Sequence, residues 1–236
     1  MHNQKRILLI VTGHTIEPVR SMFQNTEAHF ANAIGNAGQL HPYAICEDWP
    51  TKPTPNLSEF DGVIMTGSAS MVGDNSPWIQ ESKKLVEQCI RDEIPFLGVC
   101  FGHQILGAVC GAKVGPNPSG RANGSRLVNL TQEAPIFNGL PSSFWAQISH
   151  RDVVLENRPE FNVIATAPHD ARHAIEVGKT AFGVQFHPEW DIHISRAYID
   201  ARQEVLGEAV ANAMRATLTE SPVAGLILKR FVEELA

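Results

Sequence analysis

The sequence predicts an α/β fold: an open, mostly parallel sheet flanked by helices, with a smaller antiparallel flap and a helical C-terminal extension. Three observations lead to this fold class. Short apolar runs alternate with helix-like segments over the first half of the 236 residues, five strand-like segments then follow with few helices between them, and the pattern turns helical from about residue 192. Repeated strand–helix units indicate parallel strands joined by right-handed crossovers.

Four apolar runs in the first half are predicted to be strands. They cover residues 6–13, 43–47, 60–67 and 94–100. Continuous apolar runs of this length are typical of strands that are buried on both faces. Helices are expected over about 25–38, closed by Gly38, from Ser76-Pro77 onward, and from Phe101 onward. Serine as the cap and proline at the first helical position commonly begin a helix.

The second half is expected to supply the antiparallel flap. Its predicted strands cover residues 125–131, 143–149, 161–167, 173–177 and 181–188. Gly178-Lys179-Thr180 has the composition of a hairpin turn between the last two strands. Residues 192–236 are expected to form helices with a break at Pro222. We interpret residues 1–236 as a single domain, with a core over about 5–191 and an extension over about 192–236.

Composition limits the kinds of partner. With 43% hydrophobic residues, the chain can bury a sizeable core. Its formal net charge of -6 gives no reason to expect a nucleic-acid partner, because phosphate binding needs a basic surface. The apolar run near the N-terminus is too short for a secretion signal or a membrane span. The four cysteines form no C-x-x-C pair. We therefore expect a cytoplasmic protein with free thiols and no membrane partner.

One cysteine, Cys100, stands between two glycines where a predicted strand meets a predicted helix, in the stretch FLGVCFGHQ. A nucleophile at a tight strand-to-helix turn projects above the sheet, and Gly98 and Gly102 leave room for close packing. The helix N-terminus would favour the thiolate form of the sulfur. The N–H of Phe101 would be placed to bind a developing oxyanion. A cysteine in such a core can also serve only as a small apolar residue.

Two more segments carry groups that such a nucleophile needs. In Phe186-His187-Pro188-Glu189, residues two apart in extended backbone point to the same side, so Glu189 could orient His187 as a base. Taken alone, this segment could equally lie on a solvated surface. Met65-Thr66-Gly67-Ser68 ends a predicted strand in small residues, at the carboxyl edge where open α/β sheets bind ligands.

Together, GVCFGHQ, GVQFHPE and TGSASMVGDNSPW resemble the corresponding segments of the class I glutamine amidotransferases. The order Cys, His, Glu agrees with that of the family triad. The similarity covers about residues 5–191. It implies a flavodoxin-like fold, with the catalytic core over that range, and an enzyme that hydrolyses the side-chain amide of glutamine. By position, it also implies Cys100 as the nucleophile, His187 as base and acid, and Glu189 as the orienting carboxylate.

The resemblance implies roles for other residues as well. The oxyanion hole would be formed by backbone N–H groups of Gly67, Ser68 and Phe101. SHRD (149–152) resembles the segment that helps to hold glutamine. The implied substrate-binding residues are Gln104, Ser149, His150 and Arg151. Many family members have Gly-Gly where this chain has Gly67-Ser68, and serine restricts positive φ, so the geometry of the hole is left open.

Three functions remain open from the sequence. The first is hydrolysis of glutamine to supply ammonia to a separate synthase subunit. The second is hydrolysis or transpeptidation of other γ-glutamyl compounds by the chain alone. No P-loop is found, so we expect no fused ATP-using synthase half. The third function is that of a redox-sensing or chaperone protein with Cys100 as an oxidisable thiol, which would need no His-Pro-Glu segment.

No cofactor and no metal are expected. His187, Glu189, Asp191 and His193 do alternate in the manner of metal ligands. The first two, however, belong to the implied triad. Asp191-Ile192-His193 begins a predicted helix, which would turn His193 away from the others. Glutamine or another γ-glutamyl small molecule is therefore the expected partner at this site.

Overall fold

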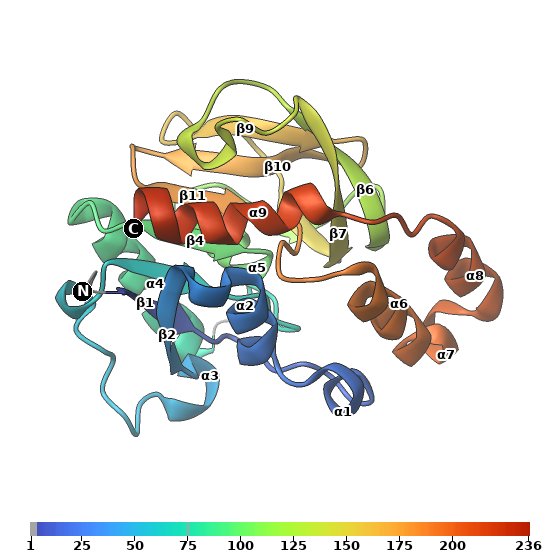
Figure 1. Ribbon diagram of the computed structural model, residues 1–236, viewed down its shortest axis with the longest axis horizontal. Coiled ribbons are helices and arrows are strands. Elements are labelled where there is room, and N and C mark those ends of the chain that lie inside the picture. Colours follow the sequence, from blue (N-terminus) through green and yellow to red (C-terminus); the bar gives the residue numbers. More distant parts are fainter. Residues whose placement is uncertain (1–3, 75) are drawn as a thin grey trace.

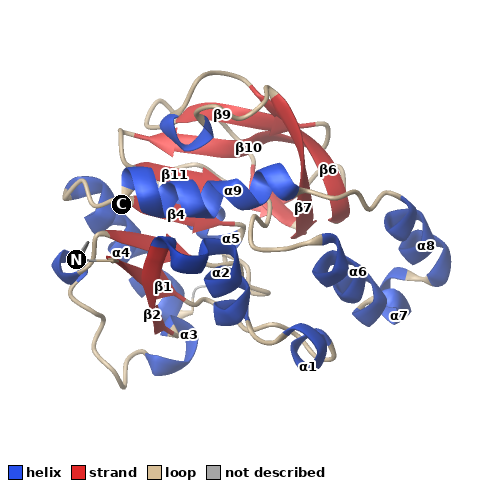
Figure 2. Ribbon diagram, in the orientation of Figure 1, coloured by secondary structure: helices blue, strands red, loops and turns tan. Residues whose placement is uncertain are grey.

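A nine-stranded sheet runs through the molecule, with helices on both of its faces (Figure 1, Figure 2). This computed structural model describes residues 4–74 and 76–236. The strand order is β2-β1-β3-β4-β11-β10-β9-β6-β7. The predicted α/β class is therefore confirmed.

The first five strands in this order are parallel. They are β2 (Gly38–Tyr43), β1 (Lys5–Ile10), β3 (Gly62–Met65), β4 (Phe96–Val99) and β11 (Ala181–Val184). Every residue of β3, β4 and β11 is buried. Strands covered by helices on both faces need apolar residues on both faces, which explains their continuous apolar runs.

The other four strands are antiparallel and continue the same sheet. They are β10 (Asp170–Val177), β9 (Asn162–Ala167), β6 (Ala122–Leu130) and β7 (Ser143–His150). β10 and β11 are joined through the predicted turn, in which Gly178 has a φ of 61°. The antiparallel part thus grows directly from the parallel sheet. A separate pair, β5 (Val114–Pro116) and β8 (Asp152–Val154), was not predicted.

Helices cover both faces of the sheet. One face carries α2 (Thr26–Ile34), α9 (Pro222–Arg230) and the π-helical turn η4 (Phe231–Leu235); the other carries α3 (Ile45–Asp48), α4 (Pro77–Arg91) and α5 (Phe101–Val109). Further helices group at one end of the molecule: α1 (Val19–Phe23), α6 (Ile192–Ala201), α7 (Gln203–Leu206) and α8 (Glu208–Ala216) (Figure 1). No helix in the described ranges is long and apolar enough to cross a membrane.

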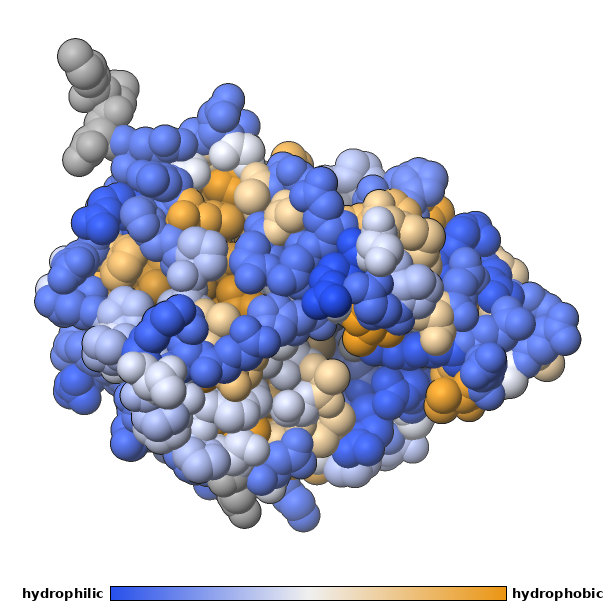
Figure 3. Space-filling view, turned by 90° about the horizontal axis from the view of Figure 1, so that it is seen from below, coloured by the Kyte–Doolittle hydropathy of each residue, from blue (hydrophilic) through white to orange (hydrophobic). Residues whose placement is uncertain are grey.

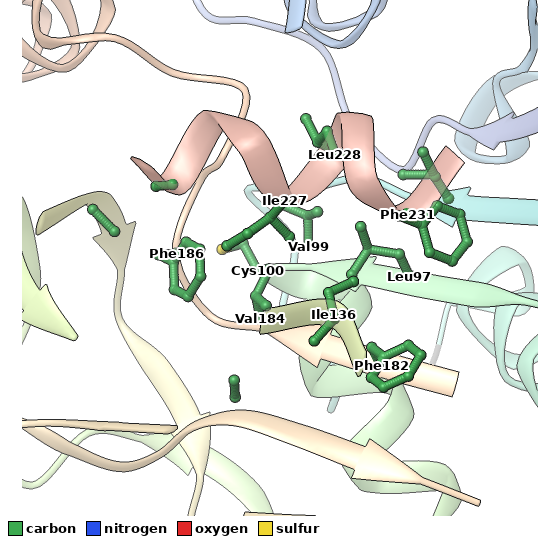
Figure 4. Packing of buried hydrophobic residues seen from close by; sticks show 14 of the residues in the cluster. Leu97, Val99, Cys100, Ile136, Phe182, Val184, Phe186, Ile227, Leu228 and Phe231 are labelled. Atoms are coloured by element: carbon green, nitrogen blue, oxygen red, sulfur yellow. The ribbon is translucent and has the colours of Figure 1, made fainter. Parts of the chain in front are cut away.

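The predicted C-terminal helices include one that belongs to the main core. Pro222 begins α9, as the predicted break indicates. Ile227 and Leu228 of α9 and Phe231 of η4 are fully buried in the same hydrophobic cluster as Cys100 (Figure 4). Truncating one buried leucine or isoleucine to alanine typically costs about 2–5 kcal/mol. The last helix is therefore integral to the fold that carries Cys100 and its strand-to-helix turn, called the elbow below.

Two local predictions were wrong. The second strand covers Gly38–Tyr43, whereas 43–47 was predicted, and most of that stretch forms α3. The preceding helix ends at Ile34, followed by Gly35 at a φ of 59°, so Gly38 begins the strand and does not close the helix. Pro42 made this segment look unlike a strand in the sequence. A strand at the edge of the sheet, such as β2, tolerates proline. Ser76 precedes α4 as predicted, but its side chain makes no capping hydrogen bond.

Candidate active site

Cys100 occupies the turn between β4 and α5. Its backbone has φ 52° and ψ −97°, a strained combination for a residue with a side chain, of the order of 1–3 kcal/mol. Its N–H donates to the carbonyl oxygen of Val184 at 2.8 Å. A Cβ on Gly98 would lie 2.4 Å from the carbonyl carbon of Gly102, and one on Gly102 would lie 2.5 Å from the carbonyl oxygen of Met65. The turn can be this tight only with glycine at both positions.

His187 and Glu189 lie side by side. Nδ1 of His187 is 2.7 Å from Oε1 of Glu189, and both side chains are buried. The N–H of His187 donates to the carbonyl of Gln147 at 2.8 Å, which fixes the backbone at the start of the segment. The imidazole stacks on Trp190, with ring centroids 3.8 Å apart, and Trp190 stacks on Tyr198 at 4.3 Å. The imidazole of His187 is therefore held at its edge by Glu189 and on one face by Trp190.

The surroundings of His187 favour its protonated form. Burial alone would lower the pKa of this imidazole, but the carboxylate of Glu189 and the sulfur of Cys100 outweigh burial and raise the pKa to about 10. At neutral pH the ring therefore carries a proton next to the sulfur.

Two glutamines form a hydrogen-bonded chain that ends at the sulfur. Nε2 of Gln185 lies 3.6 Å from Sγ of Cys100. Nε2 of Gln104 donates to the carbonyl of Asp152 at 2.8 Å and to Oε1 of Gln185 at 3.2 Å. The amide nitrogen of Gln104, predicted to bind substrate, is thus engaged within the protein, although the residue also lines a cavity at Cys100. Gln185 was not singled out from the sequence.

The loop of residues 66–70 packs directly against the Cys–His pair. A Cβ placed on Gly67 would lie 3.0 Å from Cε1 of His187 and 3.9 Å from Sγ of Cys100. The carbonyl of Gly67 accepts hydrogen bonds from the hydroxyls of Thr12 at 3.0 Å and Thr66 at 3.1 Å. Because C=O and N–H point in opposite directions across a trans peptide, the N–H of the next residue faces away from these threonines. The orientation of this peptide is therefore fixed.

Ser68 fits this loop without strain. It is not among the residues with positive φ, so its side chain carries no backbone penalty. Its hydroxyl donates to the carbonyl of Thr12 at 2.7 Å and accepts from the N–H of Ser70 at 3.1 Å. The departure from Gly-Gly thus supplies two hydrogen bonds that hold the loop. Phe101 is the first residue of α5, so its N–H has no acceptor within that helix.

Two small cavities meet at Cys100. One, of about 60 Å³, lies along Gly67, His187 and the stacked Trp190 and Tyr198. The other, of about 130 Å³, is bordered by three cationic side chains, those of Arg121, Arg151 and Arg202. Cavities of this size at a buried sulfur suit a group as small as an amino-acid side chain.

The predicted substrate-binding segment divides between two environments. Ser149 lines both cavities; its hydroxyl donates to Oδ1 of Asn123 at 2.7 Å and accepts from Nη1 of Arg202 at 2.6 Å. Arg151 lines the second cavity and pairs with Asp152. The residue between them, His150, also borders that cavity, but its ring nitrogens contact other groups of the protein.

The alternating metal-ligand pattern does not converge on one point. Asp191 caps α6, because its side chain accepts from the N–H of Ile194 at 2.8 Å. His193 is exposed on the same helix. Two residues further along do reach the cavities at Cys100: Tyr198 lies on α6, and Arg202 directly follows that helix. They lie beyond the predicted core, where no local motif marked them.

A strained cysteine at a strand-to-helix turn, beside a buried His–Glu pair at the end of a central parallel strand, is an arrangement suited to cysteine-dependent acyl transfer. The chain belongs to the class I glutamine amidotransferase family, whose model, described as glutamine amidotransferase class-I, matches residues 27–199. Members of this family are cysteine-dependent glutamine amidotransferases, so the predicted class of enzyme is confirmed.

Relatives among curated proteins include subunits of GMP synthase and longer GMP synthases. A subunit of glutamine-hydrolysing GMP synthase from Ignicoccus hospitalis is 34% identical over 157 residues, 66% of this chain and 77% of the relative. The corresponding subunit from Methanothermobacter thermautotrophicus is 30% identical over 168 residues, 69% of this chain and 89% of the relative. The longer GMP synthase of Aeropyrum pernix is 35% identical over 128 residues, 54% of this chain but only 24% of its own length.

Solved structures share the whole fold. A glutamine amidotransferase from Thermotoga maritima aligns with a TM-score of 0.78 over 99% of both chains, at 23% sequence identity. Another from Methylobacillus flagellatus aligns with a TM-score of 0.70 over 99% of this chain and 93% of its own, at 18% identity. At such identities the likeness establishes the architecture, including the helical C-terminal part.

Proposed function

We propose that this chain hydrolyses the side-chain amide of glutamine through a γ-glutamyl thioester on Cys100. The observation that carries the proposal is the geometry at the elbow: a strained cysteine, with a hydrogen-bonded His187–Glu189 pair and the Gly67 loop packed against it. Family membership supports the same chemistry.

The reaction would proceed in two steps. Sγ of Cys100 attacks the amide carbon, and the oxyanion is bound by backbone N–H groups of Phe101 and of the Gly67–Ser68 region. His187 gives its proton to the leaving nitrogen, so ammonia departs and the thioester remains. Water then attacks the thioester with His187 as the base, which releases glutamate and regenerates the thiol. Glu189 holds the imidazole in place throughout.

Arg202 would bind the α-carboxylate of the substrate. It borders both cavities at Cys100, and its Nη1 is positioned by the hydroxyl of Ser149 at 2.6 Å. The guanidinium also packs 5.2 Å from the ring centre of Tyr198, which limits its freedom. A guanidinium held in this way suits a carboxylate because its donors form a planar fork.

The ammonia would be used by a separate synthetase subunit. This part of the proposal draws on the two curated relatives that are themselves named as GMP synthase subunits. Both align with this chain over most of their own length. On the face of the molecule in Figure 3, hydrophobic residues form small groups between hydrophilic ones. Permanent interfaces are usually more apolar than a mixed surface of this kind.

The test measures ammonia and glutamate from glutamine with the purified chain, alone and mixed with the synthetase subunit of a GMP synthase. We expect one ammonia and one glutamate per turnover, a higher rate with the partner, and neither product from Cys100→Ala. In the mixture, GMP formed with glutamine as the only nitrogen source reports whether ammonia is transferred. Release of ammonia by Cys100→Ala at the wild-type rate would rule out the proposed nucleophile.

A γ-glutamyl peptide or amide hydrolase is the second candidate. The observation that favours it is the group of three arginines at the second cavity, since a γ-glutamyl peptide carries a carboxylate beyond the one that glutamine has. Equal or faster turnover of γ-glutamyl peptides by the chain alone, without stimulation by a synthetase subunit, would select this alternative.

A further inference from the structure

Three histidines form a cluster next to the second cavity, apart from the proposed catalytic groups. His150 ends β7, His169 lies in the turn between β9 and β10, and His173 lies on β10. One ring nitrogen of each lies within 4.8 Å of those of the other two. His150 and His173 are buried, whereas His169 is partly exposed. Three imidazoles that converge in this way can serve as ligands for one ion.

Two of the rings are already oriented as metal ligands usually are. Nδ1 of His173 is 3.0 Å from Oδ2 of Asp170, and Nδ1 of His150 is 3.2 Å from the carbonyl oxygen of Asp152. Carboxylate and carbonyl oxygens only accept, so Nδ1 carries the hydrogen in each neutral ring and Nε2 keeps its lone pair. Histidines that bind metals almost always donate their other N–H to a carboxylate or a backbone carbonyl.

One pair of ring nitrogens already has a separation that fits a small ion, and His173 offers a nitrogen within 4.8 Å of the other two histidines. Nε2 of His150 and Nε2 of His169 are 3.1 Å apart. Two imidazole nitrogens on one tetrahedral zinc, each at about 2.0–2.1 Å from the metal, lie about 3.3 Å from each other. Within the described part of the chain, Nε2 of His173 is buried and has no hydrogen-bond partner. A buried polar atom of this kind calls for a ligand or another explanation.

We propose that His150, His169 and His173 bind a divalent transition-metal ion of the zinc type. Imidazole nitrogen is a preferred ligand of zinc and of its neighbours in the series, and three protein ligands leave a fourth position for water. The carboxylate of Asp170, behind His173, offsets part of the ion's charge. The partly exposed His169 gives the ion a route from solvent, and its side chain can adjust as the ion binds.

The ion would tie three parts of the antiparallel half together: the end of β7, the β9–β10 turn and β10 itself. Ser149 and Arg151, on either side of His150, both line the cavity at Cys100. A bound ion would therefore stiffen the backbone that borders the substrate cavity. The inference concerns binding and stability, and it is independent of the proposed reaction.

The experiment uses the full chain as Cys100→Ala, so that the elbow thiol and His187 cannot together capture a thiophilic metal. After removal of metals with EDTA, Co²⁺ is titrated and followed by visible absorption, and Zn²⁺ is titrated by calorimetry. We expect one ion per chain, an intense cobalt band typical of four-coordination, displacement of cobalt by zinc, and a higher Tm with zinc. His169→Gln should weaken binding by about tenfold or more.

The matched control is His193→Gln, which removes an exposed histidine of α6 outside the cluster and should leave binding unchanged. X-ray absorption at the zinc edge provides a readout that needs no substitution in the cluster, and it should count three imidazole ligands. The proposal is overturned if the chain shows no saturable binding, if binding survives His169→Gln undiminished, or if the bound zinc has fewer than three imidazole ligands.

Discussion

The side-chain nitrogen of Gln185 lies 3.6 Å from the sulfur of Cys100, while its oxygen accepts a hydrogen bond from Gln104. The NH₂ group of Gln104 also donates to a backbone carbonyl, so the nitrogen of Gln104, and not its oxygen, faces Gln185. The amide of Gln185 therefore has a single orientation, with its oxygen toward Gln104 and its nitrogen toward the sulfur. The sulfur therefore has an N–H donor on one side. A donor of this kind stabilises an anion more than a neutral thiol.

Gln185→Leu should slow both acylation and alkylation of Cys100. The substitution keeps similar volume but removes the donor, and a hydrogen bond to a charged group contributes about 1.5–3 kcal/mol, or about tenfold to a hundredfold in rate. Alkylation of Cys100 by iodoacetamide, followed by mass spectrometry, measures this without substrate. An unchanged alkylation rate, with the variant still folded, would assign Gln185 a packing role only.

Cys100→Ala should abolish turnover, by about a thousandfold or more, and leave the fold intact, because alanine fits where a small thiol stood. Cys89→Ala is the matched control. Burial raises the pKa of Cys89 to about 12, so this thiol stays protonated and unreactive. A glutamine analogue with an electrophilic group should label Cys100 alone among the four cysteines. Labelling of Cys89 at a comparable rate would contradict this assignment.

His187→Ala should slow acylation by about a hundredfold to ten-thousandfold, because it removes the group that transfers the proton. Glu189→Gln keeps the shape of the side chain but loses the charge that supports the imidazolium, so we expect a smaller loss. Single-turnover release of ammonia separates the two variants. If Glu189→Gln reacts as fast as the wild type, the 2.7 Å contact serves structure and not the reaction.

Arg202→Met should raise KM for glutamine about tenfold to a hundredfold with a smaller effect on kcat, since it would lose a charge-assisted hydrogen bond to the α-carboxylate. Arg202→Lys retains the charge but not the planar fork, so its KM should fall between those of the wild type and Arg202→Met. The stacked Tyr198 remains in both variants, so packing is largely matched. Steady-state kinetics is measured with glutamine and with glutaminamide, an analogue without the carboxylate. If Arg202→Met raises KM equally for both substrates, Arg202 does not bind the α-carboxylate.

Stability should fall as the pH drops from about 6.5 to about 4. Burial lowers the pKa of His103 to about 4, and burial with neighbouring histidines lowers that of His150 to about 3, both from 6.5. The unfolded chain therefore binds these protons first, and each costs about 1.4 kcal/mol of folding free energy per pH unit in this range. Urea unfolding in EDTA at several pH values measures the slope. Equal stability at pH 7 and pH 5 would show that these rings are not buried in neutral form.

Local sequence patterns predicted the groups that depend on a few neighbouring residues. The elbow at Cys100 needs glycines two positions away, and His187 and Glu189 share one extended segment, so both could be recognised from the chain alone. Arg202 could not, because its contact with Ser149 joins residues 53 positions apart with no periodic signal. The contact between the rings of His150 and His169 likewise joins two residues that only the antiparallel pairing brings near each other.

The same contrast applies to the fold. Buried strands such as β4 are marked by their continuous apolarity, whereas β2 at the sheet edge contains Pro42 and polar residues and was placed too late in the sequence. The C-terminal helices were expected, but the fixed position of α9 in the cluster that contains Cys100 depends on the apolar face that the folded sheet presents. Sequence propensity predicts that a helix or strand forms, and tertiary packing determines where it lies in the fold.

The side chain of Gln147 donates to the carbonyl of Thr219 at 2.8 Å and to the hydroxyl of Ser221 at 3.0 Å, while its backbone carbonyl accepts the N–H of His187. The segment that leads into α9 is thus attached to Gln147, which also holds the backbone of His187. A single protease cut in that segment should silence the enzyme without removing any reacting atom. Turnover can therefore report whether α9 is packed in its place in the core.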